Sequence, residues 1–210
     1  MKFDIITLFP EMFAGVFDVS MIGRAKEKGL IEINFHQMRQ WAWNSYGAVD
    51  DRPYGGDVGM LIRVDVIDEA LKEIRTKKSH VILTSARGKR FTQEDAERLA
   101  KEENIIIICG HYEGFDERVS GLVDEEISVG DYVLTGGEIP AMIITDAVAR
   151  LKSGVLGKDE SSKIESFSGP ERKIEFPQYT RPAEYNGQKV PEVLLSGDPK
   201  KIKEWQDNQK

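Results

Sequence analysis

Residues 128–140, with the sequence SVGDYVLTGGEIP, decide how the rest of the chain is interpreted. The segment predicts a short apolar strand that runs into a double glycine, Gly136-Gly137, and then directly into a helix. Adjacent glycines let a ligand approach backbone N–H and C=O groups, and Pro140 suits a first helical turn, where no backbone donor is needed. Taken alone, the segment also fits an ordinary strand-to-helix connection.

A second glycine-bearing turn lies upstream. Residues 105–109, IIIIC, predict a buried strand, and residues 110–118, GHYEGFDER, follow it at once. Ligands of open parallel sheets bind beyond the carboxyl ends of the strands, so we expect both turns to line one pocket. Neither turn has the spacing of a nucleotide phosphate loop, and the expected ligand therefore need not carry phosphate.

Strands alternate with helices over the first 151 residues. Strands are predicted at residues 3–8, 81–85 and 105–109, and helices after Pro10, after Asp65, after Thr92 and over residues 140–151. Asp65 and Thr92 are each followed three residues later by an aspartate, a spacing typical of a helix N-terminus. The turn at residues 85–90 is a third loop at the same sheet edge. This alternation predicts an α/β fold with a parallel sheet covered on both faces.

The pattern changes after Arg150. Residues 152–163 have little apolar periodicity and many small or charged residues, which predicts a linker or a lid. Further on, Asp198 and Pro199 predict the start of a helix over residues 199–209, with Ile202 and Trp205 on one face.

Composition narrows the class of protein. The longest aliphatic run, residues 105–108, is far shorter than the roughly 18 to 20 residues of a membrane-spanning helix. Residues 1–10 fit a first strand better than a signal sequence, so we expect a cytoplasmic protein. The single cysteine, Cys109, forbids an internal disulfide and is expected to be a small buried hydrophobe. His36, His80 and His111 have no metal-ligand spacing, and no metal site is predicted.

Charge is unevenly distributed. The net charge of −7 argues against a protein that coats nucleic acid non-specifically. Residues 150–210 nevertheless hold 12 basic and 10 acidic residues, whereas residues 1–149 hold 17 and 26. Affinity for RNA depends on the phosphates that are actually neutralised, so a local basic surface would suffice. A solvated surface of mixed charge explains the same excess.

Four segments together closely resemble the bacterial tRNA (guanine-N1)-methyltransferase family, TrmD, of the SPOUT superfamily. They are the two glycine-bearing turns, residues 49–56 (VDDRPYGG) and residues 176–182 (FPQYTRP). The resemblance runs from Phe3 to about Trp205. It implies a deep trefoil knot in the parallel sheet, S-adenosylmethionine as methyl donor, a homodimer, and methylation of N1 of the guanosine 3′ of the anticodon (position 37) in tRNA. Magnesium assistance is implied by the resemblance alone.

The resemblance also divides the chain. It implies a SPOUT S-adenosylmethionine-binding catalytic domain at residues 1–157, a flexible linker at residues 158–170 and a partial C-terminal tRNA-binding domain at residues 171–210. The family usually continues for several helical turns here, so the helical C-terminal region is expected to be short and truncated.

Methyl transfer to guanine N1 requires in-line approach of the two atoms and removal of the N1 proton. A carboxylate is a suitable base, and an arginine suits the charge that develops on the guanine carbonyl oxygen. By resemblance, Arg150 is the catalytic arginine, and Glu165 stands where the family has its catalytic aspartate. Glutamate has one more methylene than aspartate, so its carboxylate would lie in a different position relative to the N1 proton. Without the resemblance, Arg150 is an ordinary helix C-terminal cation and Glu165 an exposed acid of the linker.

The resemblance places the donor site on sixteen residues: Leu83, Thr84, Ser85, Gly110, Tyr112, Glu113, Gly114, Ser128, Val129, Gly130, Asp131, Tyr132, Val133, Leu134, Gly136 and Gly137. Backbone groups there would read the adenine edge, and Glu113 would offset the positive charge of the methionine moiety. Ala86 replaces a proline common in the family. Asp57-Val58 replaces part of a glycine-proline run and puts an acid near the expected phosphates of the tRNA.

Two other hypotheses remain open. The Glu165 change and the short C-terminus would suit a SPOUT-like RNA-binding protein with impaired catalysis. A dinucleotide-dependent oxidoreductase is the third, and it lacks the phosphate turn that such enzymes use.

Overall fold

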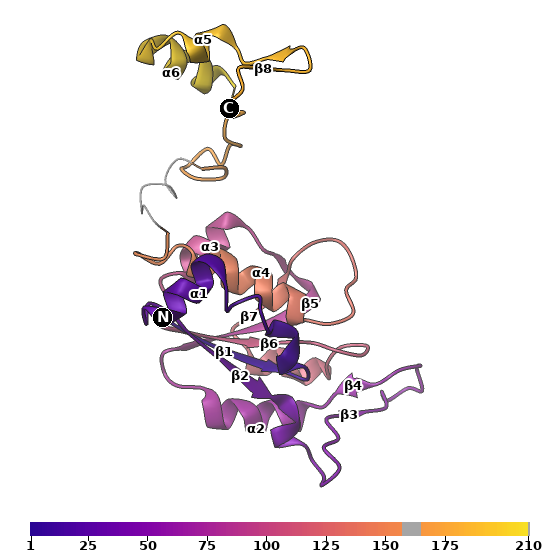
Figure 1. Ribbon diagram of the computed structural model, residues 1–210. Helices are drawn as coiled ribbons and strands as arrows, with labels where there is room; N and C mark the ends of the chain where they lie inside the picture. The colour runs from indigo at the N-terminus through magenta and orange to yellow at the C-terminus, as the bar shows by residue number, and fades with distance from the viewer. Residues whose placement is uncertain (157–164, 210) are drawn as a thin grey trace. The chain divides into compact units, whose positions relative to one another are not determined.

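The computed structural model of the chain describes residues 1–156 and 165–209. The chain divides into two compact units, residues 1–157 and residues 158–210, coloured from indigo to orange and from orange to yellow in Figure 1. The expected linker at residues 158–170 lies partly outside the described residues, and its flexibility stays a prediction.

The first unit is built on a five-stranded parallel sheet. Its strands lie in the order β2-β1-β6-β5-β7, and every neighbouring pair is parallel. The strands are β1 (Lys2–Thr7), β2 (Glu32–Gln37), β5 (Ser79–Arg90), β6 (Asn104–Ile108) and β7 (Glu125–Ser128). The predicted α/β fold with a parallel sheet is therefore confirmed.

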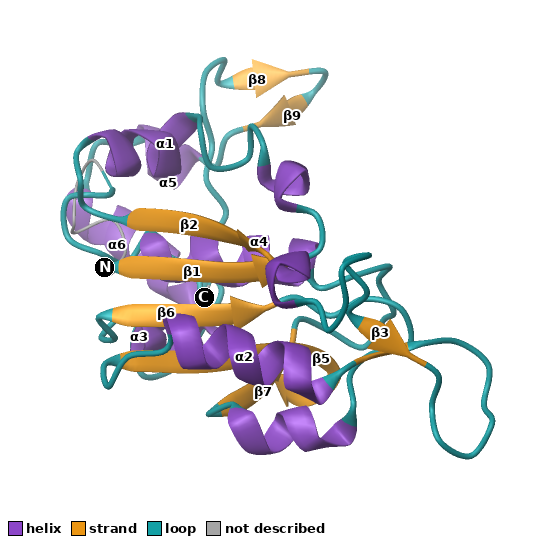
Figure 2. Ribbon diagram, turned by 90° about the horizontal axis from the view of Figure 1, so that it is seen from below, coloured by secondary structure: helices purple, strands orange, loops and turns teal. Residues whose placement is uncertain are grey.

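Both faces of the sheet are buried, and successive residues of a strand pack alternately into the core on one face and the core on the other. On β1, Phe3 and Ile5 join the core beneath α1 (Ser20–Glu27), α3 (Gln93–Leu99) and α4 (Glu138–Ala149), whereas Ile6 joins the core beneath α2 (Val64–Ile74). On β6, Ile105 and Ile107 face the first core and Ile106 the second. Figure 2 shows α2 across one face of the sheet, with α3 and α4 on the other. This two-sided burial explains why β6 reads as a continuous aliphatic run.

Shorter elements connect these layers. They are the 3-10 helices η1 (Pro10–Phe13), η2 (Met38–Trp41) and η3 (Glu117–Leu122) and the antiparallel pair β3 (Asp50–Asp51) and β4 (Leu61–Ile62). Among the described residues, no helix is both long and apolar enough to cross a membrane.

Two predicted helix starts are wrong. The helix expected after Pro10 is only the turn η1, and α1 does not begin until Ser20. The turn ends at Ala14, whose ψ of 129° lies outside the helical region, and Gly15 follows with a φ of +83°. Asp65 does not cap α2: it lies inside the helix, and its carboxylate accepts two hydrogen bonds from the Arg63 guanidinium, at 2.6 and 3.0 Å. The capping box of Thr92 and Asp95 on α3 is confirmed.

The strand predicted within residues 128–140 is also displaced. Strand β7 ends at Ser128, and residues 129–137 form a loop whose Tyr132 and Val133 are exposed. Tyrosine and valine favour strands, but beyond Ser128 no neighbouring strand remains to pair with them, because β5 ends opposite Ser128 at Arg90. The apolar residues of this loop are therefore available to line a cavity.

The second unit is small, and its helices and strands are short. It contains β8 (Glu184–Tyr185), β9 (Gln188–Lys189), α5 (Glu192–Leu195) and α6 (Pro199–Asn208). The Trp205 ring contacts Phe176 and Tyr179, with ring centroids 6.4 Å apart in both pairs. The Asp198 carboxylate accepts hydrogen bonds from the N–H groups of Lys200 and Lys201, which confirms the predicted helix start. None of residues 165–209 is fully buried.

Candidate active site

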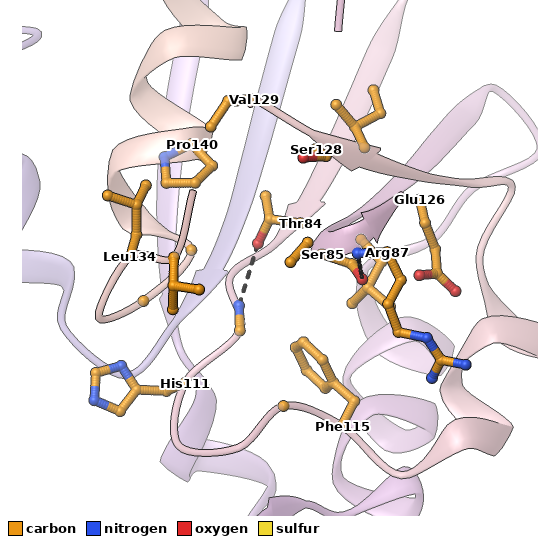
Figure 3. Close-up of a pocket in the computed structure, with 18 of the residues that line it drawn as sticks. Thr84, Ser85, Arg87, His111, Phe115, Glu126, Ser128, Val129, Leu134 and Pro140 are labelled. Carbon is orange, nitrogen blue, oxygen red and sulfur yellow. Dashed lines mark hydrogen bonds between the residues drawn. The ribbon is translucent and has the colours of Figure 1, made fainter. Parts of the chain in front are cut away.

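A cavity of about 340 Å³ lies at the carboxyl ends of β6 and β7, beside residues 83–87 of β5. Both glycine-bearing turns line it, together with the irregular part of β5 around residues 85–87. In Figure 3, Leu134 and Pro140 lie on one side of the cavity, and Phe115, Arg87 and Glu126 lie on the other. The shared pocket expected from the two turns is thus present in the fold, and its volume is that of a small-molecule site.

The structure brings together fifteen of the sixteen residues assigned to the donor site. The cavity is lined by Leu83, Thr84, Ser85, Gly110, Tyr112, Glu113, Gly114, Ser128, Val129, Gly130, Tyr132, Val133, Leu134, Gly136 and Gly137. Asp131 is the exception: its side chain is 89% exposed, and its carboxylate lies 3.6 Å from the Arg90 guanidinium. Asp131 does not line the cavity, because its side chain extends into solvent.

A buried threonine ties two of the cavity loops together. The Thr84 hydroxyl donates to the Ile108 carbonyl at 3.0 Å and accepts from the Gly110 N–H at 3.2 Å. The Gly137 N–H in turn donates to the Gly110 carbonyl at 2.7 Å. A Cβ atom on Gly137 would lie 2.5 Å from the Gly110 nitrogen and would also collide with the Thr84 hydroxyl. Glycine is therefore required at residue 137 because the two loops are in direct backbone contact.

The cavity walls differ in character. Leu134, Val129 and Pro140 give an apolar side, and Glu113, Asp116 and other acids give a polar one. The guanidinium of Arg118 holds the pKa of Asp116 at about 2, chiefly through side-chain hydrogen bonds of 2.6 and 2.8 Å. A ligand with a flat apolar part and a positive charge matches such walls.

Several residues of the cavity were not predicted. They are Ala86, Arg87, His111, Phe115, Asp116, Glu117, Ser120, Glu126, Ile127, Thr135 and Pro140. The residues of this set that lie within 110–118 or 128–140 could have been assigned to the site from their position in those two segments. Arg87 and Glu126 reach the cavity because β5 changes register against β7 between Thr84 and Lys89, which no sequence pattern indicates. Arg87 spans the rim and pairs with Glu117 at 2.7 Å.

The antiparallel pair β3 and β4 forms a hairpin that is anchored to this cavity. The Ile62 N–H donates to the Gly114 carbonyl, and the Asp116 N–H donates to the Ile62 carbonyl, both at 2.9 Å. A Cβ atom on Gly59 would collide with the Glu113 side chain. Backbone hydrogen bonds therefore join strand β4 directly to the glycine-bearing turn at residues 110–118.

Comparison with known proteins decides the family. The family model described as tRNA (Guanine-1)-methyltransferase TrmD matches residues 1–210. The chain belongs to this family. A tRNA (guanine-N(1)-)-methyltransferase of Geobacter sp. (strain M21) is 52% identical over 208 residues, which are 98% of this chain and 83% of the relative. The protein of the same name from Syntrophomonas wolfei is 50% identical over 209 residues, 100% of this chain and 85% of the relative. The protein of the same name from Streptococcus pyogenes serotype M4 is 53% identical over 205 residues, which are 98% of this chain and 84% of the relative.

The two residues assigned to catalysis in this TrmD family member lie in different units. Arg150 follows the last turn of α4, the helix that begins at the double glycine, and its N–H donates to the Asp146 carbonyl at 3.1 Å. Glu165 belongs to the second unit, where its carbonyl accepts from the Ser168 N–H at 3.1 Å. Both catalytic roles therefore stay predictions. Asp159 and Glu160, other acids of the same segment, lie outside the described residues.

Proposed function

We propose that this protein transfers the methyl group of S-adenosylmethionine to N1 of the guanosine 3′ of the anticodon in tRNA. The observation that carries the proposal is the match to the TrmD family along the whole chain, at about 50% identity to curated relatives. Oxidoreductase chemistry has no support, since relatives of this similarity carry the methyltransferase name. A cytoplasmic location is part of the proposal, because tRNA is the substrate.

The donor fits the cavity in chemistry as well as in size. S-adenosylmethionine supplies a methyl group activated by a sulfonium charge. The flat adenine suits the apolar side near Leu134 and Pro140, and the two glycine turns, which line the cavity, would present backbone groups to its edge. Glu113 and the other acids of the cavity suit the positively charged methionine end.

The chain's own groups would perform the remaining chemistry. The N1–methyl bond forms as the sulfonium C–S bond breaks, and the N1 proton must pass to a base. Glu165 would accept that proton, and Arg150 would stabilise the charge on the guanine carbonyl oxygen. Magnesium stays an implication of the family resemblance: within residues 1–156 and 165–209, no three His, Cys, Asp or Glu side chains are grouped to hold a metal ion.

A homodimer is also part of the proposal, and an exposed apolar face supports it. Ile139 and Ile143 on α4 are 44% and 40% exposed, and Met12 and Val16 in and after η1 are 42% and 48% exposed. Helix α4 packs against η1, so these side chains lie on adjoining elements. Exposed apolar side chains gathered on adjoining elements are typical of protein–protein interfaces. The deep trefoil knot and the division into catalytic and tRNA-binding domains complete the proposal.

Calorimetric titration tests the donor assignment. We expect S-adenosylmethionine to bind with one site per chain and NAD not to bind. Binding of NAD without S-adenosylmethionine would contradict the proposal. Donor binding without turnover on any tRNA would instead support the RNA-binding protein with impaired catalysis.

A further inference from the structure

A buried carboxylate lies directly behind the double glycine. Glu138 is the first residue of α4, follows Gly137 and is only 1% exposed. It does not line the cavity. Glutamate is almost never fully buried unless it is paired, because removing a carboxylate from water is unfavourable. The presence of Glu138 in the interior therefore requires a structural explanation.

The partner of Glu138 is the last residue of β1. The Thr7 hydroxyl donates to Glu138 Oε1 at 2.8 Å and accepts from the Phe9 N–H at 2.9 Å. A carboxylate oxygen can only accept, so the one proton of the Thr7 hydroxyl points to Glu138, and the Phe9 N–H donates to a lone pair of the same hydroxyl. Thr7 is completely buried and, like Glu138, does not line the cavity.

The second carboxylate oxygen lies against the donor loop. A Cβ atom built on Gly136 would collide with Glu138 Oε2 and would lie 2.9 Å from His111 Nδ1. The Glu138 side chain therefore folds back beneath Gly136 and fills the space behind it. Burial, and next the nearby Glu138 carboxylate, raise the pKa of the Cys109 thiol well above its usual value.

We propose that Glu138 and Thr7 are positioning residues for the methyl donor. The hydrogen bond between them fastens the turn at Gly136 and Gly137 to the end of β1, and so holds the backbone groups of the turn in the geometry that binds the donor. This inference rests on the proposed function. Thr84 fastens the facing turn at Gly110 in the same manner, so each side of the donor site has its own buried threonine.

Three variants of threonine test the proposal. Thr7→Val removes the donated proton and keeps the shape of the side chain, and Thr7→Ser restores the hydroxyl. Thr145→Val is the matched control, because Thr145 is also completely buried and lies on α4, and its hydroxyl has no hydrogen-bond partner within residues 1–156 and 165–209. The measurements are S-adenosylmethionine affinity by calorimetry, steady-state kinetics on tRNA, and amide hydrogen exchange of Gly136 and Gly137.

We expect Thr7→Val to weaken donor affinity and raise the KM for the donor by about tenfold, the effect of losing one hydrogen bond to a charged group. At saturating donor, kcat should stay within about threefold of the wild type, because neither residue touches the reacting atoms. Hydrogen exchange at Gly136 and Gly137 should become faster. Thr7→Ser should restore affinity and exchange rates, and Thr145→Val should leave both unchanged.

Equal effects of Thr7→Val and Thr145→Val on donor affinity would overturn the inference. So would loss of cooperative unfolding in Thr7→Val, since the hydrogen bond would then support the whole sheet rather than one loop. Failure of the wild type to bind S-adenosylmethionine would reject the proposed function itself, and the two failures are thus distinguishable.

Discussion

At the scale of single residues, Gly136 shows how the structure changes the reason for an expectation. The sequence suggests that a side chain here would enter the ligand space. The structure instead directs the new Cβ into the protein, against Glu138 and His111. We still expect Gly136→Val to abolish donor binding, but by displacing the Glu138 carboxylate. Gly121→Val is the control, because a Cβ atom there has no heavy atom within 4 Å. Calorimetry that finds wild-type affinity in Gly136→Val would contradict the assignment of this loop.

Glu165 is the residue at which chemistry is tested most directly. Glu165→Gln should lower kcat by at least about 100-fold and leave donor affinity unchanged, because the amide cannot accept the N1 proton. Glu165→Asp should retain or raise kcat. Glu184→Gln serves as the control, since Glu184 belongs to the same unit and its carboxylate lies 3.7 Å from the Lys189 ammonium. A loss smaller than about tenfold in Glu165→Gln would exclude it as the base.

At the scale of elements, sequence patterns predicted what depends on local periodicity and missed what depends on tertiary contacts. Strand β6 and the Thr92 capping box could be predicted, because a buried strand needs consecutive aliphatic residues and a capping box needs particular residue types at fixed spacing. The shortness of η1 and the pairing of Asp65 with Arg63 could not be predicted from the sequence. For the cavity, the glycine turns were readable, whereas Arg87 enters through a register change in β5. A knot leaves no trace in hydrophobic periodicity and was inferred from resemblance alone.

An ionic contact between β5 and β7 gives an element-scale prediction. His80 Nε2 lies 2.6 Å from Glu125 Oε1, and this hydrogen bond raises the pKa of His80 above its usual value. Its stabilising contribution is therefore fully present below pH 6.5 and is lost as the pH rises through the raised pKa. We expect thermal unfolding midpoints of the wild type and His80→Gln to differ more at pH 6 than at pH 9. A constant difference would contradict the assigned contact.

The stabilising contribution of Glu125, the other partner in this contact, has the opposite dependence on pH. Burial alone would raise the pKa of Glu125, but hydrogen bonds from His80 and Arg98 lower it below its usual value. Its contribution is present above about pH 4.5 and is lost as the pH falls through the lowered pKa. Glu125→Gln should therefore destabilise the protein more at pH 7 than at pH 3 in the same unfolding measurement.

At the scale of the whole molecule, the apolar face of α4 predicts self-association. Ile143→Glu places a charge in the middle of that face and should convert a dimer to a monomer at micromolar concentration in analytical ultracentrifugation. Val58→Glu is the control, because Val58 is 94% exposed and lies on the loop between β3 and β4 rather than on α4 or η1. A monomeric wild type, or a dimer that Ile143→Glu leaves intact, would contradict the proposed interface.

The central claim is that the chain methylates one guanine nitrogen of tRNA, and labelled methyl transfer tests it most directly. Two transcripts of one tRNA are compared, one with guanosine and the other with adenosine immediately 3′ of the anticodon. The account predicts that label from S-adenosylmethionine enters only the guanosine transcript and is recovered after digestion as 1-methylguanosine. Absence of label in that transcript, equal labelling of both, or recovery of a different methylated nucleoside would contradict it.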